Sequence, residues 1–259
     1  MTSGRPRILI TNDDGVRSPG LRATYEELRQ IADVTVVAPV DQRSGTSHTI
    51  TLETPLRAHR LVDLPGWMVD FTPVDCVKLA LRQLLPHPPD LVVSGINHGW
   101  NTGNLVHYSG TVAAAKEALL NGVPALAVSL CCWEKAGDWT PAARITRKLA
   151  ERLLAHPLPP GTLLNVNVPD LPERDLKGFR WARQATRRLE DSYERREDPR
   201  KRAYFWLTGA LSGMDGDGDD DVGMVKNGFV ALTPIRIDWT DRELLGRGQA
   251  GALLDGLGT

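Results

Sequence analysis

Short apolar runs recur along the first two thirds of the chain, and each run ends at polar or turn-forming residues. Five of them are rich in Val, Ile, Leu or Ala and have the length of strands: residues 8–10, 33–38, 91–94, 125–130 and 163–168. Continuous apolar runs of this kind are typical of parallel strands that are covered on both faces. The pattern therefore predicts the interior of an α/β sheet.

Apolar residues at helical spacing separate these runs. Helices are predicted after Ser18-Pro19, from Pro73 to about Leu85, from Ser109 to Asn121-Gly122, and from Thr140-Pro141 to about Ala155. Proline at the first helical position and Asn-Gly at the end are start and stop signals. The alternation of strands and helices predicts an α/β fold with a doubly wound, mainly parallel sheet and right-handed crossovers.

The alternation is interrupted near residue 50 and again beyond Asp170. Short strands or extended segments are predicted at 49–52, 56–62 and 67–69. Farther along, the pattern predicts a solvated surface element at 183–202, strands at 203–207 and 229–234, and a flexible acidic loop at 212–222. We expect a single domain over residues 1–259, with an α/β core to about residue 170. Residues 171–259 are expected to form a β-rich tail and an extended arm or β-hairpin that is used in oligomerisation.

Charge and hydropathy narrow the possible partners. Lys and Arg number 31 against 32 Asp and Glu, for a net charge of −1. Domains that bind nucleic-acid polymers usually carry a clear basic excess, so such a partner is disfavoured. No apolar segment precedes the first strand, which predicts neither a signal peptide nor a membrane span and favours a cytoplasmic protein. The three cysteines, Cys76, Cys131 and Cys132, lack metal-ligand spacing and are expected as buried thiols.

Two adjacent carboxylates, Asp13 and Asp14, follow the first predicted strand. Ligands of open α/β sheets lie beyond the carboxyl ends of the strands, so both side chains are expected at the binding edge. Neighbouring anions repel each other unless a cation or hydrogen bonds compensate, and hard divalent ions prefer oxygen ligands. An Asn-Asp-Asp-Gly turn explains these residues equally well, because all three residue types favour turns.

Polar segments also occur at three later points. Ser44 lies in a loop rich in hydroxyl groups, and Asn97 lies in a segment rich in glycine and asparagine. Ser109-Gly110-Thr111 opens a predicted helix, where free backbone N–H groups and the helix dipole favour an anion. Ordinary capping by Ser109 or Thr111 explains that motif slightly better when it is considered alone. Should all these segments meet at one sheet edge, they would form a metal-plus-phosphate site.

Other chemistries are less well supported by the motifs. A dinucleotide fingerprint, a Walker A motif and a Gly-x-Ser-x-Gly elbow are all missing from the sequence. His98 or His107 could donate a proton to a leaving oxygen, although a structural role is more common for either alone. Asp215, Asp217 and Asp219 alternate as in a calcium loop, but Asp220 and Lys226 occupy its glycine and glutamate positions.

A set of ordered motifs resembles the survival protein SurE family. The motifs are residues 10–16 (Ile-Thr-Asn-Asp-Asp-Gly-Val), 43–45 (Arg-Ser-Gly), 72–77 (Thr-Pro-Val-Asp-Cys-Val), 93–97 (Val-Ser-Gly-Ile-Asn) and 108–115 (Tyr-Ser-Gly-Thr-Val-Ala-Ala-Ala). Asp198-Pro199-Arg200, Tyr204-Phe205-Trp206 and Thr233-Pro234 extend the similarity toward the C-terminus.

This resemblance implies a Rossmann-like three-layer core and a metal-dependent phosphatase. The implied substrates are nucleoside 5′-monophosphates, with 3′-nucleotides and short polyphosphate in some members, and the implied assembly is a homodimer or homotetramer built partly by exchanged C-terminal segments. By motif position, one Mg²⁺ or Mn²⁺ per subunit would be bound by Asp13, Asp14, Ser44 and Asn97, and the two aspartates would be catalytic. The residues that would face the phosphate are Asn12, Asn101, Ser109, Gly110 and Thr111.

Two departures from the family pattern are visible. Arg236 stands where many members have a histidine, two residues after the Thr-Pro of the last strand, and Asn104-Leu105 stands where acidic residues are common. A proton-transfer role cannot be carried over to either position. The alternative function is therefore a non-catalytic nucleotide sensor or assembly protein on the same fold. The sequence also leaves open whether water or a carboxylate attacks phosphorus.

Overall fold

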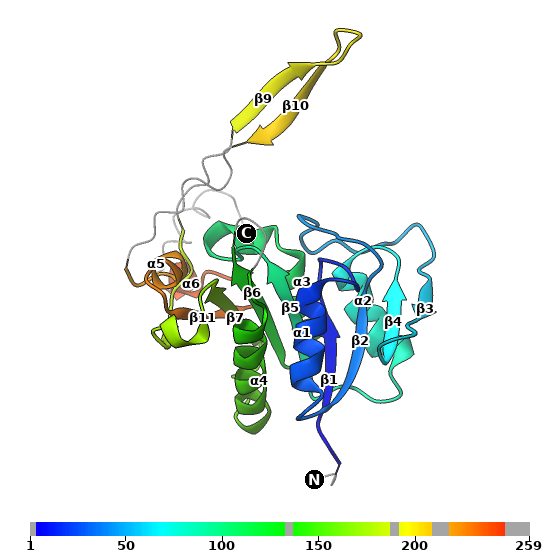
Figure 1. Ribbon diagram of the computed structural model, residues 1–259, viewed down its shortest axis with the longest axis vertical. Coiled ribbons are helices and arrows are strands. Elements are labelled where there is room, and N and C mark those ends of the chain that lie inside the picture. Colours follow the sequence, from blue (N-terminus) through cyan, green and yellow to red (C-terminus); the bar gives the residue numbers. More distant parts are fainter. Residues whose placement is uncertain (1–3, 133–136, 187–191, 209–217, 247–259) are drawn as a thin grey trace, which may run out of the picture.

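The computed structural model describes residues 4–132, 137–186, 192–208 and 218–246. Within that part of the chain, nine strands form one sheet (Figure 1). In spatial order they are β3 (Ala58–Arg60), β4 (Gly66–Val69), β2 (Asp33–Pro39), β1 (Arg7–Thr11), β5 (Leu91–His98), β6 (Ala125–Cys131), β7 (Thr162–Pro169), β11 (Val230–Arg236) and β8 (Phe179–Trp181). The sheet is mainly parallel, and antiparallel pairing occurs at β3–β4 and at β11–β7.

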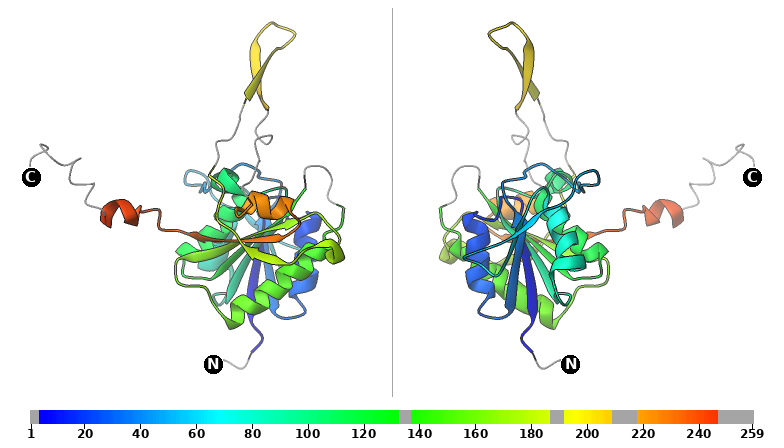
Figure 2. Two further views of the ribbon diagram at one scale, coloured as in Figure 1. Left: turned by 90° about the vertical axis from the view of Figure 1, so that its left-hand side faces the viewer. Right: turned by 90° about the vertical axis from the view of Figure 1, so that its right-hand side faces the viewer.

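Helices cover both faces of this sheet (Figure 2). One face packs against α1 (Pro19–Leu28) and α4 (Thr140–Ala155), and the other packs against α2 (Pro73–Leu79) and α3 (Gly110–Leu120). Alternation along β1 explains the two layers, because Ile8 and Ile10 join the first core and Leu9 joins the second. The expected three-layer α/β fold is confirmed.

The strand order reverses at β1. The chain runs from β1 through α1 to β2 on one side, and later returns through α2 to β5 on the other side of β1. Such a switch point leaves a crevice beyond the carboxyl ends of the two strands, where α/β proteins bind ligands. The residues after β1 and at the end of β5 therefore lie where a site is expected.

Several predicted elements differ from the structure. Residues 49–52 contain no strand, and the predicted strand 56–62 is limited to Ala58–Arg60. β5 continues beyond Ser94 to His98, although a glycine-rich loop was predicted from residue 95. The strand continues because Asn97 and His98 still pair with β6, after an irregularity in register that begins at Ser94.

The helix predicted from Pro73 to about Leu85 is divided. Its α-helical part ends at Leu79 and a π-helical turn, η1 (Ala80–Leu84), completes it. All three cysteines are buried free thiols, as expected. In the part of the chain that the structure describes, none of the helices is long and apolar enough to cross a membrane.

The C-terminal third contributes to the main sheet and also leaves it. β8 and β11 lie at one edge of the sheet, whereas β9 (Ser192–Glu197) and β10 (Ala203–Thr208) form a separate antiparallel hairpin that extends away from the core (Figure 1). Short helical elements complete the described chain: η2 (Gly103–His107), η3 (Glu173–Asp175), α5 (Asp221–Lys226) and α6 (Arg242–Gly246).

The acidic segment predicted as a flexible loop, residues 212–222, is structured at its end. Asp220 caps α5 by accepting a hydrogen bond from the Gly223 N–H at 2.8 Å, and Asp221 is fully buried. The prediction is therefore wrong for residues 220–222, because capping and buried hydrogen bonds use the two carboxylates. Asp215 and Asp217 lie outside the described residues.

Candidate functional site

The turn between β1 and α1 presents Asp13 and Asp14 at the switch point. Ser18 caps α1 by accepting from the Leu21 N–H. The Asn12 amide donates to the Gly15 carbonyl at 3.0 Å and to Ser18 Oγ at 2.6 Å, which ties the turn to that cap. The predicted turn is thus present, and it holds the two carboxylates at the carboxyl edge of the sheet.

Asp13 is buried beneath the N-terminus of α3. Burial raises its pKa, the hydrogen bond that the Thr111 hydroxyl donates to Oδ1 lowers it, and the neighbouring charge of Asp14 raises it again, for a pKa of about 6. A buried carboxylate with this pKa lacks full compensation for its negative charge. The place that it occupies therefore favours a positive partner.

Asp14 is half-buried and lies on the β5 side of the turn. Its Oδ2 accepts a hydrogen bond from the His98 backbone N–H at 2.8 Å. Burial raises the pKa of Asp14, and the hydrogen bond from His98 opposes that shift. The last residue of β5 thus fixes the second carboxylate of the pair.

The loop after β2 covers Asp13 from the other side. The Arg43 N–H donates to the Asp13 carbonyl at 2.6 Å, and the Thr46 hydroxyl donates to the Arg43 carbonyl at 3.0 Å. Ser44, the next residue after Arg43, is exposed, and its Oγ accepts from the Gln42 amide at 2.9 Å. The structure thereby brings the predicted Ser44 loop next to the Asp13 backbone.

The N-terminus of α3 completes this wall. Ser109 acts as the N-cap by accepting from the Val112 N–H at 3.1 Å. At Gly110 an added Cβ would lie 2.9 Å from Asp13 Cβ and 3.0 Å from Asp13 Oδ2, so only glycine allows this close approach. Capping by Ser109 is thus observed, and Thr111 contacts Asp13 directly.

Asn97 and Asn101 lie along the end of β5 and the loop after it. The Asn97 amide donates to the Gly99 carbonyl at 3.1 Å. The Asn101 amide donates to Ser129 Oγ at 2.8 Å, while the Asn101 carbonyl accepts from the amides of Asn165 and Asn167. Asn101 is therefore fixed by a buried polar network on β6 and β7.

Two residues that the sequence analysis considered, His107 and Arg236, contact parts of the molecule other than the two aspartates. The His107 ring lies near Gln184 and meets the Trp239 ring edge-on at 6.3 Å between centroids. Arg236 pairs with Thr162 at the start of β7, which places it at the edge of the sheet opposite the aspartates. His98, in contrast, lies beside Asp14.

The sequence did not reveal the buried residues whose hydrogen bonds fix the loops of the candidate site. Asp75 and Glu117 contact the loop that follows Ser44. Asn165 and Asn167 hydrogen-bond to Asn101, and Asp221 accepts from the Gly103 N–H. The alternation of Asn165 and Asn167 within an apolar strand was a usable signal, since buried polar residues in a strand need a specific reason. The partners of Asp75, Glu117 and Asp221 lie too far away in sequence to be recognised from it.

The donor atoms at this edge fit a hard divalent cation. In the part of the chain that the structure describes, no group of three His, Cys, Asp or Glu residues could hold a metal. The available set is instead two carboxylates, the Asn97 amide and the Ser44 hydroxyl, all oxygen donors of the kind that Mg²⁺ and Mn²⁺ accept. Asn12 Oδ1 is buried beside them and accepts no hydrogen bond within the described residues. A buried oxygen that accepts no hydrogen bond from the described residues can accept one from a water molecule or coordinate a cation.

The fold and this edge define a doubly wound α/β protein whose switch point combines paired carboxylates with a helix N-terminus. The chain belongs to the survival protein SurE family, whose model matches residues 8–191. It is 45% identical over 243 residues to the 5′-nucleotidase SurE of Heliobacterium modesticaldum, covering 92% of this chain and 89% of that protein. The 5′-nucleotidase SurE of Desulforudis audaxviator is 46% identical over 247 residues, with 92% and 95% covered.

A solved structure supports the same family. The crystal structure of the SurE protein from Aquifex aeolicus superimposes with a TM-score of 0.84 at 34% identity, and the match covers 95% of this chain and 100% of that one. The family that the motifs indicated is confirmed, and so is the α/β fold class.

Proposed function

We propose that this protein is a metal-dependent 5′-nucleotidase that hydrolyses nucleoside 5′-monophosphates to nucleoside and phosphate. Relatives that are 44–46% identical over most of the chain are named 5′-nucleotidase SurE. The observation that carries the proposal here is the buried Asp13, which lies against the N-terminus of α3 and beside Asp14. Paired carboxylates and a helix N-terminus in one place suit a cation and a phosphate together.

Each group has a role in this proposal. Asp13, Asp14, Ser44 and Asn97 would hold one Mg²⁺ or Mn²⁺ per subunit, and the ion would polarise the phosphoryl group and activate water or position a carboxylate for attack. The phosphate would lie against Ser109, Gly110 and Thr111 at the N-terminus of α3, where the helix dipole favours its negative charge, and against Asn12 and Asn101. Ser109 positions this helix end through its cap, and Thr111 orients Asp13 through its hydroxyl group.

The alternative function, a non-catalytic nucleotide sensor, rested on Arg236. That residue lies at the opposite edge of the sheet from Asp13 within its own chain, so its side chain gives no reason to expect a disabled carboxylate pair. The proposal extends to 3′-nucleotides and short polyphosphate as further substrates. A cytoplasmic location stays a prediction from the sequence.

Assembly is part of the proposal. We take the chain to form a homodimer or homotetramer through the C-terminal region, in particular the β9–β10 hairpin. Both strands expose apolar side chains away from the core: Tyr193, Tyr204, Phe205, Trp206 and Leu207. Large apolar residues clustered on an exposed surface are typical of protein interfaces.

Phosphate release from AMP with added Mn²⁺ tests the activity. The wild-type protein should release phosphate, and Asp13→Asn should remove activity while its thermal unfolding stays cooperative. Asp63→Asn is the matched control, because Asp63 is an exposed carboxylate that pairs with Arg22. Activity that persists in the presence of a chelator would contradict the metal dependence, and AMP binding without turnover would favour the sensor.

A further inference from the structure

A hollow of about 500 Å³ opens beside Asp14. It lies between the β1–α1 turn, the loop after β2, the end of β5 and the start of α4, and its lining includes Asp14, Arg17, Asp41, Gln42, His98 and Trp139. Small-molecule sites commonly have volumes of roughly 300–1,000 Å³. We infer that this hollow, called here the Trp139 pocket, binds the base of a purine nucleotide, which stacks on the indole of Trp139. The inference rests on the proposed function, because it concerns the substrate of that site.

Trp139 occupies a position for which its side chain is poorly suited locally. It is the N-cap of α4, where Ser, Thr, Asp or Asn is preferred, and it makes no side-chain capping bond. The carboxylate of Asp138 accepts from the Thr140 N–H at 2.8 Å instead. Capping therefore gives no reason for an indole at this place, and its two contacts are with the core and with the pocket.

The indole is held in place by α1. A Cβ added to Gly20 would lie 2.6 Å from Cζ3 and 3.0 Å from Cε3 of Trp139, so the indole packs closely against this glycine. Trp139 is partly buried and also packs against the core. A ring fixed in this way loses little conformational freedom when a ligand stacks on it, which favours binding.

His98 connects the two ends of the pocket. Its backbone N–H donates to Asp14 Oδ2 at 2.8 Å, and its ring centroid lies 6.2 Å from that of Trp139 with the planes tilted by 46°. In a nucleoside 5′-monophosphate the ribose separates the phosphate from the base. Because Asp14 and Trp139 line the same hollow, a phosphate held beside the aspartates leaves the base within reach of the indole. Because the two rings are tilted, they do not form a parallel clamp, and the base stacks on Trp139 alone.

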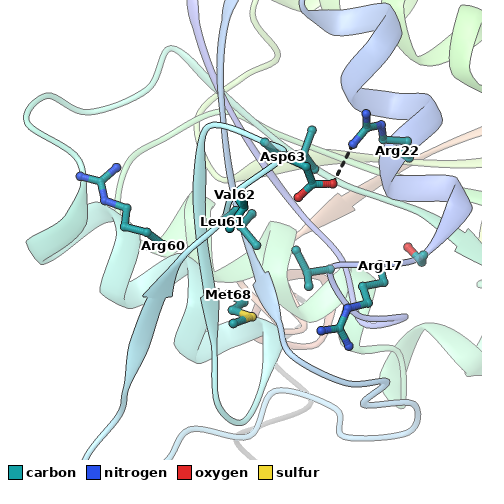
Figure 3. A pocket seen from close by; sticks show the side chains of 10 residues that line it. Arg17, Arg22, Arg60, Leu61, Val62, Asp63 and Met68 are labelled. Carbon is teal, nitrogen blue, oxygen red and sulfur yellow. Dashed lines mark hydrogen bonds and ion pairs between the residues drawn. The ribbon is translucent and has the colours of Figure 1, made fainter.

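A neighbouring hollow of about 480 Å³ is less suited to a base (Figure 3). It shares Arg17 and Ser18 with the Trp139 pocket, but none of its lining residues is aromatic. Two of its lining residues, Arg22 and Asp63, form an ion pair at 3.0 Å, which Figure 3 marks with a dashed line. Stacking is therefore assigned to the Trp139 pocket. Arg17 lines both hollows, and its guanidinium donors match the ring acceptors of a purine.

Steady-state kinetics on AMP and on ribose 5-phosphate test the inference, because the second substrate lacks a base. Stacking of a base on an aromatic side chain contributes substantially to the free energy of binding. Trp139→Ala should therefore raise KM for AMP by about 5- to 100-fold, with kcat within about twofold of wild type. Values for ribose 5-phosphate should stay within about twofold of wild type. Trp139→Phe should recover most of the affinity for AMP. Trp181→Ala is the matched control, since this exposed tryptophan lies on β8 at the far edge of the sheet.

Adenosine binding, measured by calorimetry, separates failure of this inference from failure of the proposed function. If the wild type cleaves neither substrate but binds adenosine, and Trp139→Ala abolishes that binding, the pocket is supported and the 5′-nucleotidase proposal fails. If the wild type cleaves AMP and Trp139→Ala leaves its KM unchanged, the pocket assignment is wrong and the activity stands. Equal losses on AMP and ribose 5-phosphate would show a structural role for Trp139 and would also overturn the inference.

Discussion

Asp221 accepts a hydrogen bond from the backbone N–H of Gly103 at 2.9 Å, although 118 residues separate the two. The other carboxylate oxygen accepts from the N–H groups of Ala185 and Val222, each at 3.0 Å. One fully buried side chain thus joins three segments: the loop after β5, the chain after β8 and α5. The C-terminal part of the protein thereby fixes the loop that carries Asn101.

Loss of this carboxylate should destabilise the fold. Asp221→Ala leaves the buried N–H groups of Gly103 and Ala185 without acceptors, at a cost of about 1–3 kcal/mol for each unsatisfied group. We expect the urea midpoint of unfolding to fall clearly, by an amount equivalent to about 2–5 kcal/mol. Asp219→Ala is the control, because Asp219 forms an exposed ion pair with Arg183 and such pairs contribute about 0–1 kcal/mol. Equal midpoints for the two variants would contradict the structural role of Asp221.

Glu117 should make stability depend on pH. Burial raises its pKa, but hydrogen bonds from His48, Lys78 and Asn121 lower it more, so that the net pKa lies below the ordinary value of 4.5. A carboxylate whose pKa is depressed by folding stabilises the fold above its unfolded pKa, and this contribution is lost as the pH falls through the folded pKa. Wild type should therefore be more stable than Glu117→Gln near pH 7 by about 1–3 kcal/mol.

The difference in the free energy of unfolding between wild type and Glu117→Gln should become smaller as the pH falls below about 4.5. Urea unfolding at pH 7, 5, 4 and 3 measures it. Glu151→Gln serves as the control, since Glu151 is exposed and pairs with Arg147 one helical turn away. A constant difference across this pH range would show that Glu117 is not ionised in the way that its contacts indicate.

Most strands and helices of the core and the polar edge of the sheet could be predicted from local patterns, whereas β8, β9 and α5 were not. Apolar runs such as Ile8–Ile10 and start signals such as Ser18-Pro19 act within a few residues, so the sequence displays them directly. β5 was predicted too short because its last residues are held by pairing with β6, and composition does not show pairing. Local patterns reveal an element, and its neighbours decide where it ends.

The supporting contacts of the site could not be predicted for a related reason. Thr51 donates to Asp75, and His48 lies 3.0 Å from Glu117, so the loop that follows Ser44 is held by α2 and α3. Asp75 also forms the capping box of α2 with Thr72. In the sequence, Asp75 and Glu117 look like ordinary polar positions on helices. Only the tertiary structure shows that both carboxylates position a loop.

Gly110→Ala should impair catalysis more than stability. The new methyl group would lie 2.9 Å from Asp13 Cβ and 3.0 Å from its Oδ2, which forces the carboxylate to move by a few tenths of an ångström or more. Small displacements of reacting groups can lower rates by about 100-fold, so we expect kcat for AMP to fall by about 10- to 100-fold.

Gly137→Ala is the matched control for this effect. A Cβ added at Gly137 meets only Asp170 Oδ1, at an ordinary 3.9 Å, so this variant should keep wild-type kinetics. Thermal unfolding of both variants shows whether the protein stays folded. Unchanged kcat for Gly110→Ala would mean that the position of Asp13 has no influence on the reaction, contrary to its proposed role.

The exposed aromatic side chains of the β9–β10 hairpin should govern assembly. Phe205 and Trp206 are more than half exposed, at 59% and 57%, and neither belongs to a buried core cluster of the described chain. Aromatic residues buried at the centre of an interface commonly contribute 2 kcal/mol or more each, so Phe205→Ser with Trp206→Ser should weaken association by at least about 100-fold. Sedimentation velocity over a range of concentrations measures this change, and Trp181→Ser controls for the loss of an exposed tryptophan elsewhere. If the double variant sediments like wild type at every concentration, the hairpin aromatics do not hold the subunits together.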